Sequence, residues 1–303
     1  MEKVKLLTIA VISALLFTGV SQLQAKENNQ KVVLITGTAS GIGKATAELL
    51  INEGHIVYGG DIQFEKNKYL DSIGGYSIDM DVTDTAMVRA GVERIIKEQG
   101  RIDVLFNNAG FGLYAPVEET TEEDLRYQFE VNVFGVANVT RAVLPYMRPQ
   151  NSGMILNTSS MGGKIYMPLG AWYHATKHAI EGWSDCLRLE LKEFNIDVVI
   201  IEPGAILTNF GNVTTEYMQK YIEGTNYNHM IDPFVHMMDD MTPEQMERMG
   251  SDPIVIAEVV NKAINAKKPK TRYVKGKMGK FMIRYRNWFG DRAFDRMIMR
   301  MVE

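Results

Sequence analysis

Residues 32–43 read Val-Val-Leu-Ile-Thr-Gly-Thr-Ala-Ser-Gly-Ile-Gly, and this stretch decides the fold. Four apolar residues, three of them β-branched, predict a short buried strand, and the glycines predict a tight turn into a helix. Such a turn lets backbone amides approach a pyrophosphate, for which the helix N-terminus supplies partial positive charge. The spacing is Thr-Gly-x-x-x-Gly-x-Gly rather than Gly-x-Gly-x-x-Gly. A plain strand-to-helix connection is the alternative interpretation, and the rest of the chain has to decide between the two.

The cofactor prediction starts from this turn and from the strand after it. Candidate phosphate-binding residues are Gly37, Ser40, Gly41, Ile42 and Gly43. The second strand ends at Asp61, about where a dinucleotide-binding fold places an acid on the adenine ribose. A carboxylate there accepts a hydrogen bond from a 2′-hydroxyl and repels a 2′-phosphate. We therefore predict NAD as the cofactor, with NADP as the alternative.

The fold class follows from the alternation of short apolar runs with amphipathic stretches. Runs that predict strands covered on both faces lie at residues 32–35, 56–58, 104–106, 154–156 and 198–201. Helical patterns lie between them, at residues 42–52, 86–99, 122–147 and 172–194. Strict alternation implies right-handed crossovers and a parallel sheet with helices on both faces. The prediction is an α/β, doubly wound parallel sheet (Rossmann fold) in a single domain.

Composition excludes few functions. The chain has 303 residues, 46% of them hydrophobic and 23% charged, as is ordinary for a soluble globular protein. A formal net charge of −4 argues against nucleic acid as the main partner. The single cysteine, Cys186, cannot form an internal disulfide, and its helical setting predicts a buried side chain.

The first 25 residues have the layout of a secretory signal or of a membrane anchor. Lys3 and Lys5 precede an uncharged run over 6–20, and a polar stretch follows. Leu23 is larger than the residue preferred three positions before a cut after Ala25. If the segment is an anchor, a helix over the uncharged run is only about 22 Å long, whereas the hydrocarbon core of a bilayer is roughly 30 Å thick. We expect residues 1–25 to export or anchor the protein, with a cytoplasmic location as the alternative, and residues 26–30 to be a linker.

Residues 160–177 have the pattern of an active site. Tyr173 and Lys177 are four apart, so they share one face of the predicted helix. A cation beside a phenol stabilises the phenolate, and we expect Lys177 to lower the pKa of Tyr173 from about 10. Ser160 follows a predicted strand, and we expect its hydroxyl to meet the phenol across a loop.

The spacing alone is weak, because the chain contains a second pair of the same kind. Tyr273 and Lys277 are also four apart, but Val260, thirteen residues before Tyr273, offers no hydroxyl. We expect this second pair to be structural.

Taken together, these motifs resemble the short-chain dehydrogenase/reductase (SDR) family in its common single-domain type, over about residues 31–276. The resemblance is carried by residues 36–43, Asn107-Asn108-Ala109-Gly110, Asn132, Ser160, Tyr173, Lys177 and Pro203-Gly204. It implies an NAD(P)-binding Rossmann domain over 31–276, with a substrate lid at about 205–250. A basic amphipathic helix is expected over residues 277–303.

The resemblance also implies a role for each matching residue. Asp81 and Val82 match the adenine contact, and Thr208 matches the residue that binds the nicotinamide carboxamide. Asn132 matches the residue that holds a helix carbonyl and a water supplying protons to the lysine. Asp61 aligns with the acid of members that use NAD, and Ile62 stands where members using NADP often carry arginine. Further implied cofactor contacts are Asn108, Ala109, Gly110, Tyr173, Lys177, Pro203 and Gly204.

The expected function is hydride transfer between a nicotinamide cofactor and a secondary alcohol or ketone. Tyr173 acts as general acid or base, Ser160 hydrogen-bonds the substrate oxygen, and Lys177 grips the nicotinamide ribose. No metal is needed: His174 and His178 lack a third ligand at usual spacing, and helix-face packing is their expected role. The alternatives are a redox sensor or scaffold that binds NAD(P) without turnover, and an enzyme similar to sugar-nucleotide epimerases.

Substrate and partners are predicted from the C-terminal third of the chain. Residues 212–250 are rich in methionine and tyrosine, which suits a bulky apolar ligand of steroid or retinoid type; an ordinary helical core or partner surface is the alternative. Basic and aromatic residues alternate over 280–301, where the helix also suits a membrane surface. Family members often pair through the helices read here as 122–147 and 172–194, which implies a homodimer or homotetramer.

Overall fold

A computed structural model describes residues 30–239 and 241–302. The predicted signal or anchor at residues 1–25, and almost all of the linker at 26–30, lie outside the described residues. Within the described residues, no helix is both long and apolar enough to cross a membrane.

The described part of the chain forms one seven-stranded parallel sheet in the order β3-β2-β1-β4-β5-β6-β7. The strands are β1 Val32–Thr36, β2 Ile56–Asp61, β3 Tyr76–Asp79, β4 Val104–Asn107, β5 Gly153–Thr158, β6 Ile196–Pro203 and β7 Arg272–Lys275. The chain moves outward from β1 to β3 and then returns to place β4 on the other side of β1. This reversal opens a crevice at the carboxyl ends of β1 and β4, where folds of this class bind ligands. The predicted doubly wound Rossmann fold is confirmed.

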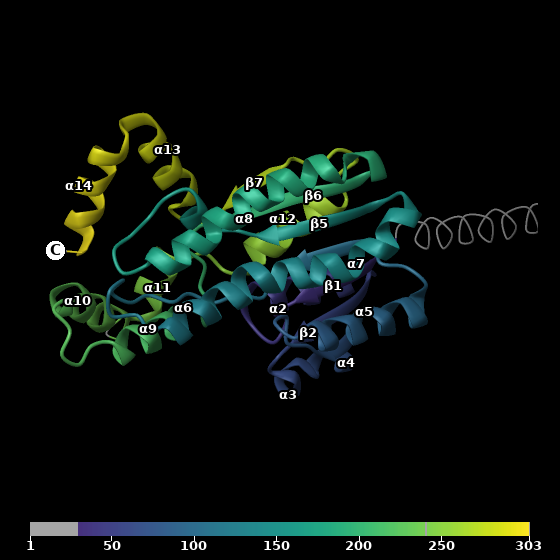
Figure 1. The fold of residues 1–303 in the computed structure, drawn as a ribbon, viewed down its shortest axis with the longest axis horizontal. Coiled ribbons are helices and arrows are strands. Elements are labelled where there is room, and N and C mark those ends of the chain that lie inside the picture. Colours follow the sequence, from purple (N-terminus) through teal and green to yellow (C-terminus); the bar gives the residue numbers. More distant parts are fainter. Residues whose placement is uncertain (1–29, 240, 303) are drawn as a thin grey trace, which may run out of the picture.

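Helices cover both faces of the sheet (Figure 1). One face carries α5 Thr85–Gln99, α7 Val136–Gln150 and α8 Ala171–Glu190; the other carries α2 Gly41–Asn52, α4 Tyr69–Ser72 and α12 Ile254–Ile264. The remaining helices are α3 Phe64–Asn67, α6 Glu122–Phe129, α9 Phe210–Lys220, α10 Asn228–Asp239, α11 Pro243–Met249, α13 Gly279–Phe289 and α14 Asp291–Val302.

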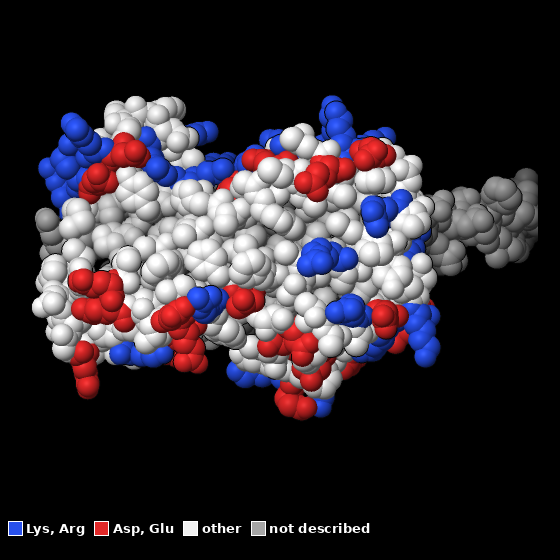
Figure 2. Space-filling model, in the orientation of Figure 1, with Lys and Arg blue, Asp and Glu red and all other residues white. Residues whose placement is uncertain are grey.

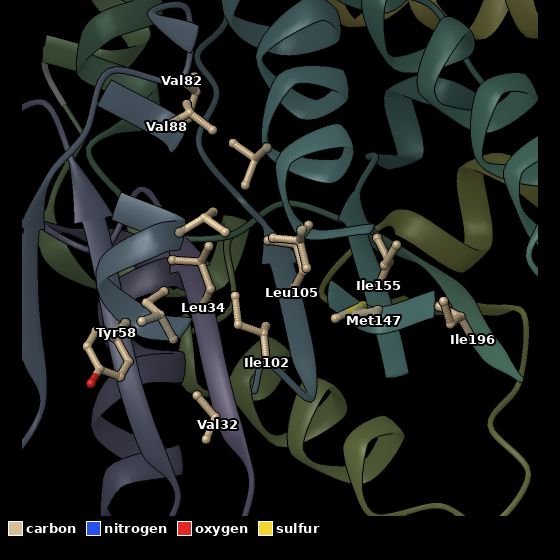
Figure 3. Packing of buried hydrophobic residues seen from close by; sticks show 14 of the residues in the cluster. Val32, Leu34, Tyr58, Val82, Val88, Ile102, Leu105, Met147, Ile155 and Ile196 are labelled. Carbon is tan, nitrogen blue, oxygen red and sulfur yellow. The ribbon is translucent and has the colours of Figure 1, made fainter. Parts of the chain in front are cut away.

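The two cores explain why β1 is apolar at each of its first four positions, 32–35. Successive side chains of a strand point to opposite faces. Val32 and Leu34 pack with α5 and α7, whereas Val33 and Ile35 pack with α2 and α12. Figure 3 shows the first of these cores, with Leu34, Leu105 and Ile155 contributed by neighbouring strands. A strand buried on both faces therefore leaves no polar periodicity in the sequence.

Five sequence-based expectations differ from the structure. The predicted helix at 122–147 is interrupted by a π-helical turn, Glu130–Gly135, between α6 and α7. Strands β3 and β7 were not predicted, because both are short and lie at the edges of the sheet, where residues are only partly buried. The single C-terminal helix is two, since Gly290 ends α13 with a φ of 75°. Cys186 is exposed, not buried.

The C-terminal third builds two additions around the carboxyl edge of the sheet. Helices α9 and α10 pack on each other through a small core that contains Met218, Ile231 and Val235. Helices α13 and α14 form a hairpin that projects from the body (Figure 1) and packs on the loop at residues 161–167. Both additions border the loops that follow β4 and β5.

Gly43 gives a test of how tightly the first turn is packed. A Cβ at this position would lie 2.0 Å from the carbonyl oxygen of Gly37. We predict that Gly43→Ala lowers the free energy of unfolding by about 1–3 kcal/mol, since backbone has to move. Gly182→Ala is the matched control: it is also helical, nothing lies within 4 Å of its Cβ, and it should stabilise by up to about 1 kcal/mol. Urea denaturation measures both, and equal midpoints would contradict the packing argument.

Candidate active site

The turns that follow β1 and β4 are held together by hydrogen bonds. The Asn108 side-chain amide donates to the carbonyl oxygens of Thr36 and Gly37, at 3.1 Å each. The Thr36 hydroxyl accepts from the backbone N–H groups of Asn108 and Ala109, at 3.0 and 3.1 Å. The turns are so close that a Cβ on Gly37, whose φ is 76°, would lie 2.9 Å from the Cα of Ala109. This position therefore requires glycine.

The acid predicted to bind the adenine ribose stands beside the first turn. The Asp61 carboxylate accepts hydrogen bonds from the backbone N–H groups of Ala39 and Gln63, both at 2.8 Å. These bonds fix its orientation at the carboxyl end of β2. Asp81, after β3, accepts from the hydroxyl and the N–H of Thr83, and the neighbouring Val82 is buried. The predicted adenine contacts thus lie at the carboxyl ends of adjacent strands.

The segment after β6 returns over the glycine turn. Gly204 donates its N–H to the carbonyl oxygen of Lys275 at 2.7 Å, and a Cβ there would lie 2.2 Å from the carbonyl oxygen of Lys277. A few residues later, the Thr208 side chain would lie 3.1 Å from a Cβ on Gly41. The structure therefore brings together the predicted cofactor residues after β1, β4 and β6. The tight, glycine-lined cradle at the N-terminus of α2 fits a dinucleotide pyrophosphate.

Ser160, Tyr173 and Lys177 meet at the start of α8. Tyr173 is 7% exposed and Lys177 is 5% exposed. The Ser160 hydroxyl lies near enough to the Tyr173 phenol to lower its pKa, and it accepts from the N–H of Gly162 at 3.0 Å. The Lys177 ammonium donates to the carbonyl oxygen of Thr158 at 2.9 Å and lies 5.8 Å from the centroid of the Tyr173 ring. The predicted convergence of these three side chains is present.

Asn132 lies in the π-helical turn and is fully buried. Its amide nitrogen donates to the carbonyl oxygen of Phe111 at 2.9 Å and to the Thr176 hydroxyl at 3.2 Å, and its oxygen accepts from the Phe111 N–H at 3.1 Å. A Cβ on Gly110 would lie 3.0 Å from that oxygen and 3.7 Å from the Lys177 ammonium. The side chain thus ties the turn after β4 to α8, whereas we expected it to hold a helix carbonyl.

Burial dominates the electrostatics of the site. It raises the pKa of Tyr173 to about 12, against a smaller lowering by the Ser160 hydroxyl. Burial also lowers the pKa of Lys177 to about 8. In both cases removal from water disfavours the charged form. The expected net lowering of the pKa of Tyr173 is therefore not found in the protein alone, because burial dominates, and the phenol keeps its proton at neutral pH.

His174 has a role that the sequence did not show. Instead of packing on a helix face, it is buried and bridges the loop after Ser160: its Nδ1 lies 2.9 Å from the carbonyl oxygen of Gly162, and its Nε2 accepts from the N–H of Met167 at 3.1 Å. Burial lowers the pKa of His174 to about 4, so the ring is neutral with its proton on Nδ1. Its position next to Tyr173 was the only signal in the sequence.

A buried charge cluster behind the site was also missed. Glu181, one turn after Lys177, accepts from Lys164 at 2.8 Å and from Arg272 at 3.0 Å. The Glu202 carboxylate lies 3.6 Å from Arg272. Burial, and then the charge of Glu181, raise the pKa of Glu202 to about 7. The signal was an acid inside the apolar run that ends at Pro203. The cluster fixes the loop after Ser160 to α8 through Lys164.

Aromatic side chains surround the exposed side of Tyr173. The Phe210 ring, on the lid helix α9, is 5.3 Å from the Tyr173 ring, and the Tyr114 ring is 5.8 Å from it. Phe111 stacks on Tyr217 of α9 at 5.5 Å. The methionines of the lid do not all have the same setting. Met218 is buried in the core of the lid, as expected for an ordinary helical core, whereas Met246 and Met249 are exposed. The reactive phenol therefore faces an aromatic, largely apolar space.

Fold and site together define a nicotinamide-dependent oxidoreductase in which a tyrosine is the proton-transferring group. Comparison with known proteins agrees: the family model described as short chain dehydrogenase matches residues 31–219. The chain belongs to the short-chain dehydrogenase/reductase family. The resemblance stated from the sequence is confirmed.

Relatives and solved structures extend this result. A 3-ketodihydrosphingosine reductase of Bacteroides thetaiotaomicron is 38% identical over 263 residues, which cover 86% of this chain and 94% of the relative. An NADPH-dependent 3-dehydrocapnine reductase of Ornithobacterium rhinotracheale is 32% identical over 80% of this chain and 87% of the relative. The crystal structure of a short-chain dehydrogenase from Streptomyces avermitilis matches with a TM-score of 0.72 and 32% identity, over 84% of this chain and 92% of that one. Matching structures include complexes with NADH and with NADP+.

Proposed function

We propose that this protein is a nicotinamide-dependent reductase of a lipophilic ketone, with Tyr173 as the proton donor. The observation that carries the proposal is the convergence of Ser160 with the buried Tyr173 and Lys177 at the edge of the glycine cradle. Two of the relatives described above are named as reductases, one of a 3-keto and one of a 3-dehydro compound. Oxidation of the corresponding secondary alcohol is the reverse of the same reaction.

The residues would share the chemistry as follows. The bound cofactor supplies hydride to the carbonyl carbon. Tyr173 gives its phenolic proton to the carbonyl oxygen, while Ser160 hydrogen-bonds that oxygen as negative charge develops on it. Lys177 stabilises the phenolate left on Tyr173. Asn132 positions the turn after β4 against the helix that carries both groups.

The pKa of the phenol favours the reductive direction at neutral pH. Burial raises the pKa of Tyr173 to about 12, so the protonated form that reduction requires is the ground state. Oxidation requires the phenolate, which forms only if the bound cofactor or the protonated Lys177 stabilises it. Because the pKa of Lys177 is lowered to about 8, that stabilisation weakens as the pH rises through this value.

We propose NAD as the preferred cofactor, with NADP as the alternative. The Asp61 carboxylate supports NAD, since its two backbone hydrogen bonds hold it where it would repel a 2′-phosphate. The relative named NADPH-dependent supports the alternative.

Two further proposals concern assembly and location. A homodimer or homotetramer through α6, α7 and α8 is supported by exposed apolar side chains on α6 (Tyr127), on α8 (Leu189) and on the π-helical turn between α6 and α7 (Phe134). Figure 2 shows a band with few charged side chains across this region. Export or anchoring by residues 1–25 rests on the sequence alone.

The assignment of Tyr173 as the proton-transferring group is tested by Tyr173→Phe. We predict that kcat/KM falls about 10²–10⁴-fold, the usual range for a lost general acid, while the dissociation constant for NADH stays unchanged. Tyr273→Phe is the matched control, because Tyr273 has the same spacing to a lysine but lies in β7, where its hydroxyl accepts from the N–H of Lys270. Appreciable turnover in Tyr173→Phe would move the proton donor elsewhere.

Cofactor choice is tested by Asp61→Ala. Removing a negative charge beside the 2′ position should raise the NADPH-to-NADH ratio of kcat/KM by about tenfold or more. Glu65→Ala, an exposed acid on the following helix that pairs with Lys68, serves as the control for charge alone. If the unaltered enzyme already prefers NADPH, the role given to Asp61 is wrong.

Substrate class is tested by steady-state kinetics over a panel of compounds. The panel contains long-chain 3-keto lipids, steroid and retinoid compounds, simple ketones, and sugars with their polyols. We predict that a lipophilic keto compound has a kcat/KM at least about a hundredfold above that of any sugar or polyol, because the site offers mainly apolar contacts. Higher kcat/KM values for polyols or sugars would refute the lipophilic proposal and leave the base assignment untouched.

A further inference from the structure

The C-terminal part of the chain is strongly basic within an acidic protein. Residues 259–290 contain ten lysines and arginines and no aspartate or glutamate, whereas the whole chain has 33 basic and 37 acidic residues. The segment covers the end of α12, the edge strand β7 and all of α13. Such a concentration of one sign of charge produces a local positive potential that the net charge of −4 conceals.

This segment folds around an open groove of about 520 Å³ between α12, β7 and α13. Besides Arg272, five of its lining residues are cations: Lys262, Lys270, Lys275, Lys280 and Arg284. Over residues 30–239 and 241–302, none of these five forms an ion pair, while Arg272 at the inner wall is neutralised by Glu181 and Asp185. Glu258 is the one acid that lines the groove. Uncompensated cations around a hollow attract an anion such as a phosphate group.

Exposed aromatic side chains stand on the same helix. Trp288 is 75% exposed, Phe289 is 62% exposed and Phe281 is 54% exposed. At about 100° per residue, Lys280, Phe281, Arg284 and Trp288 fall within one arc of roughly 100° on α13. Cations and large aromatic groups therefore share one outward face, the composition of helices that lie at a membrane interface.

The face of α13 that carries Met282 is already occupied. Met282 of α13 packs with Phe294 and Ile298 of α14 against Ile165, in the loop after Ser160. The acids at the start of α14 are also engaged: Asp291 pairs with Arg286 at 3.0 Å, and Asp295 accepts from the Tyr166 hydroxyl at 2.8 Å. Figure 2 shows lysine and arginine side chains gathered over α13 and α14. The outward face is left to contact something outside this domain.

We propose that the groove and the outward face of α13 dock the protein on an anionic lipid bilayer. Lipid phosphates would occupy the cationic groove, and Phe281 and Trp288 would enter the interfacial layer beside it. Charge complementarity selects a negative partner, and the projecting aromatic groups select a partner that is apolar just below its charged surface. An acidic protein or a nucleic acid matches the charge, but neither offers such a layer along the whole helix. The proposal does not depend on the identity of the substrate.

Vesicle binding by the full-length protein tests the proposal. We expect sedimentation with vesicles of phosphatidylcholine and phosphatidylglycerol, little with phosphatidylcholine alone, and release as sodium chloride is raised. Lys280→Glu with Arg284→Glu should weaken binding to the anionic vesicles at least about tenfold, since each basic residue near the surface contributes about 1 kcal/mol. Lys97→Glu with Lys192→Glu, both exposed on other helices, changes net charge equally and should leave binding close to that of the unaltered protein. All variants retain residues 1–25, so any contribution of that segment is common to them.

Insertion of the aromatic side chains is measured separately by fluorescence. Quenching of tryptophan emission by brominated lipid should be present in the unaltered protein and lost in Trp288→Phe, since Trp172 and Trp183 are the only other tryptophans. Circular dichroism and NADH binding establish that each variant is folded. Equal binding of the two double variants, equal binding to neutral and anionic vesicles, or binding of acidic peptides or nucleic acid in place of vesicles would overturn the proposal.

Discussion

The architecture depends on the close contact between the turns that follow β1 and β4. These strands are neighbours in the sheet, but the chain reaches β4 only after building β2 and β3 on the other side of β1. This reversal in the order of the strands leaves a crevice between the two turns. At its base, the Asn108 side-chain amide donates hydrogen bonds to two carbonyl oxygens of the glycine turn. Only residues without a Cβ allow this approach. Because the two turns are in close contact, the backbone N–H groups at the start of α2 are directed into the crevice. An anion is best placed there.

Helix α8 connects this crevice with the reactive groups. Tyr173, Lys177 and Glu181 follow one another at intervals of four and lie along one stripe of the helix. The first two are desolvated, which sets the protonation of the phenol, and the third belongs to the charge cluster with Lys164 and Arg272. Within the loop after Ser160, the charge cluster holds Lys164, and the neutral His174 holds Gly162 and Met167 on either side of it. The geometry around the phenol is thus set by buried polar contacts behind it.

The C-terminal additions give the site its surroundings. The lid helices bring Phe210 and Tyr217 over the phenol and the turn after β4, while the α13–α14 hairpin packs against the loop after Ser160. An aromatic space around the phenol, together with a basic, aromatic surface on α13, would suit the lipophilic substrate that we propose. The aromatic space and the basic surface consist of different residues, so each can be altered by mutation without changing the other.

The sequence by itself determined the parts of this protein that depend on short-range patterns. Four features could be predicted because periodicity and backbone freedom are local properties: strand β1, the glycine turn, the Tyr173–Lys177 spacing and the second pair, Tyr273 and Lys277. Edge strands β3 and β7 were not predicted, because each strand is short and only partly buried. The sign of the pKa change at Tyr173, the bridging role of His174, the interruption of the helix at 130–135 and the exposure of Cys186 were decided only by tertiary structure. Desolvation and buried hydrogen bonds depend on which distant segments of the chain cover a residue. The spacing of residues along the sequence does not show which segments these are.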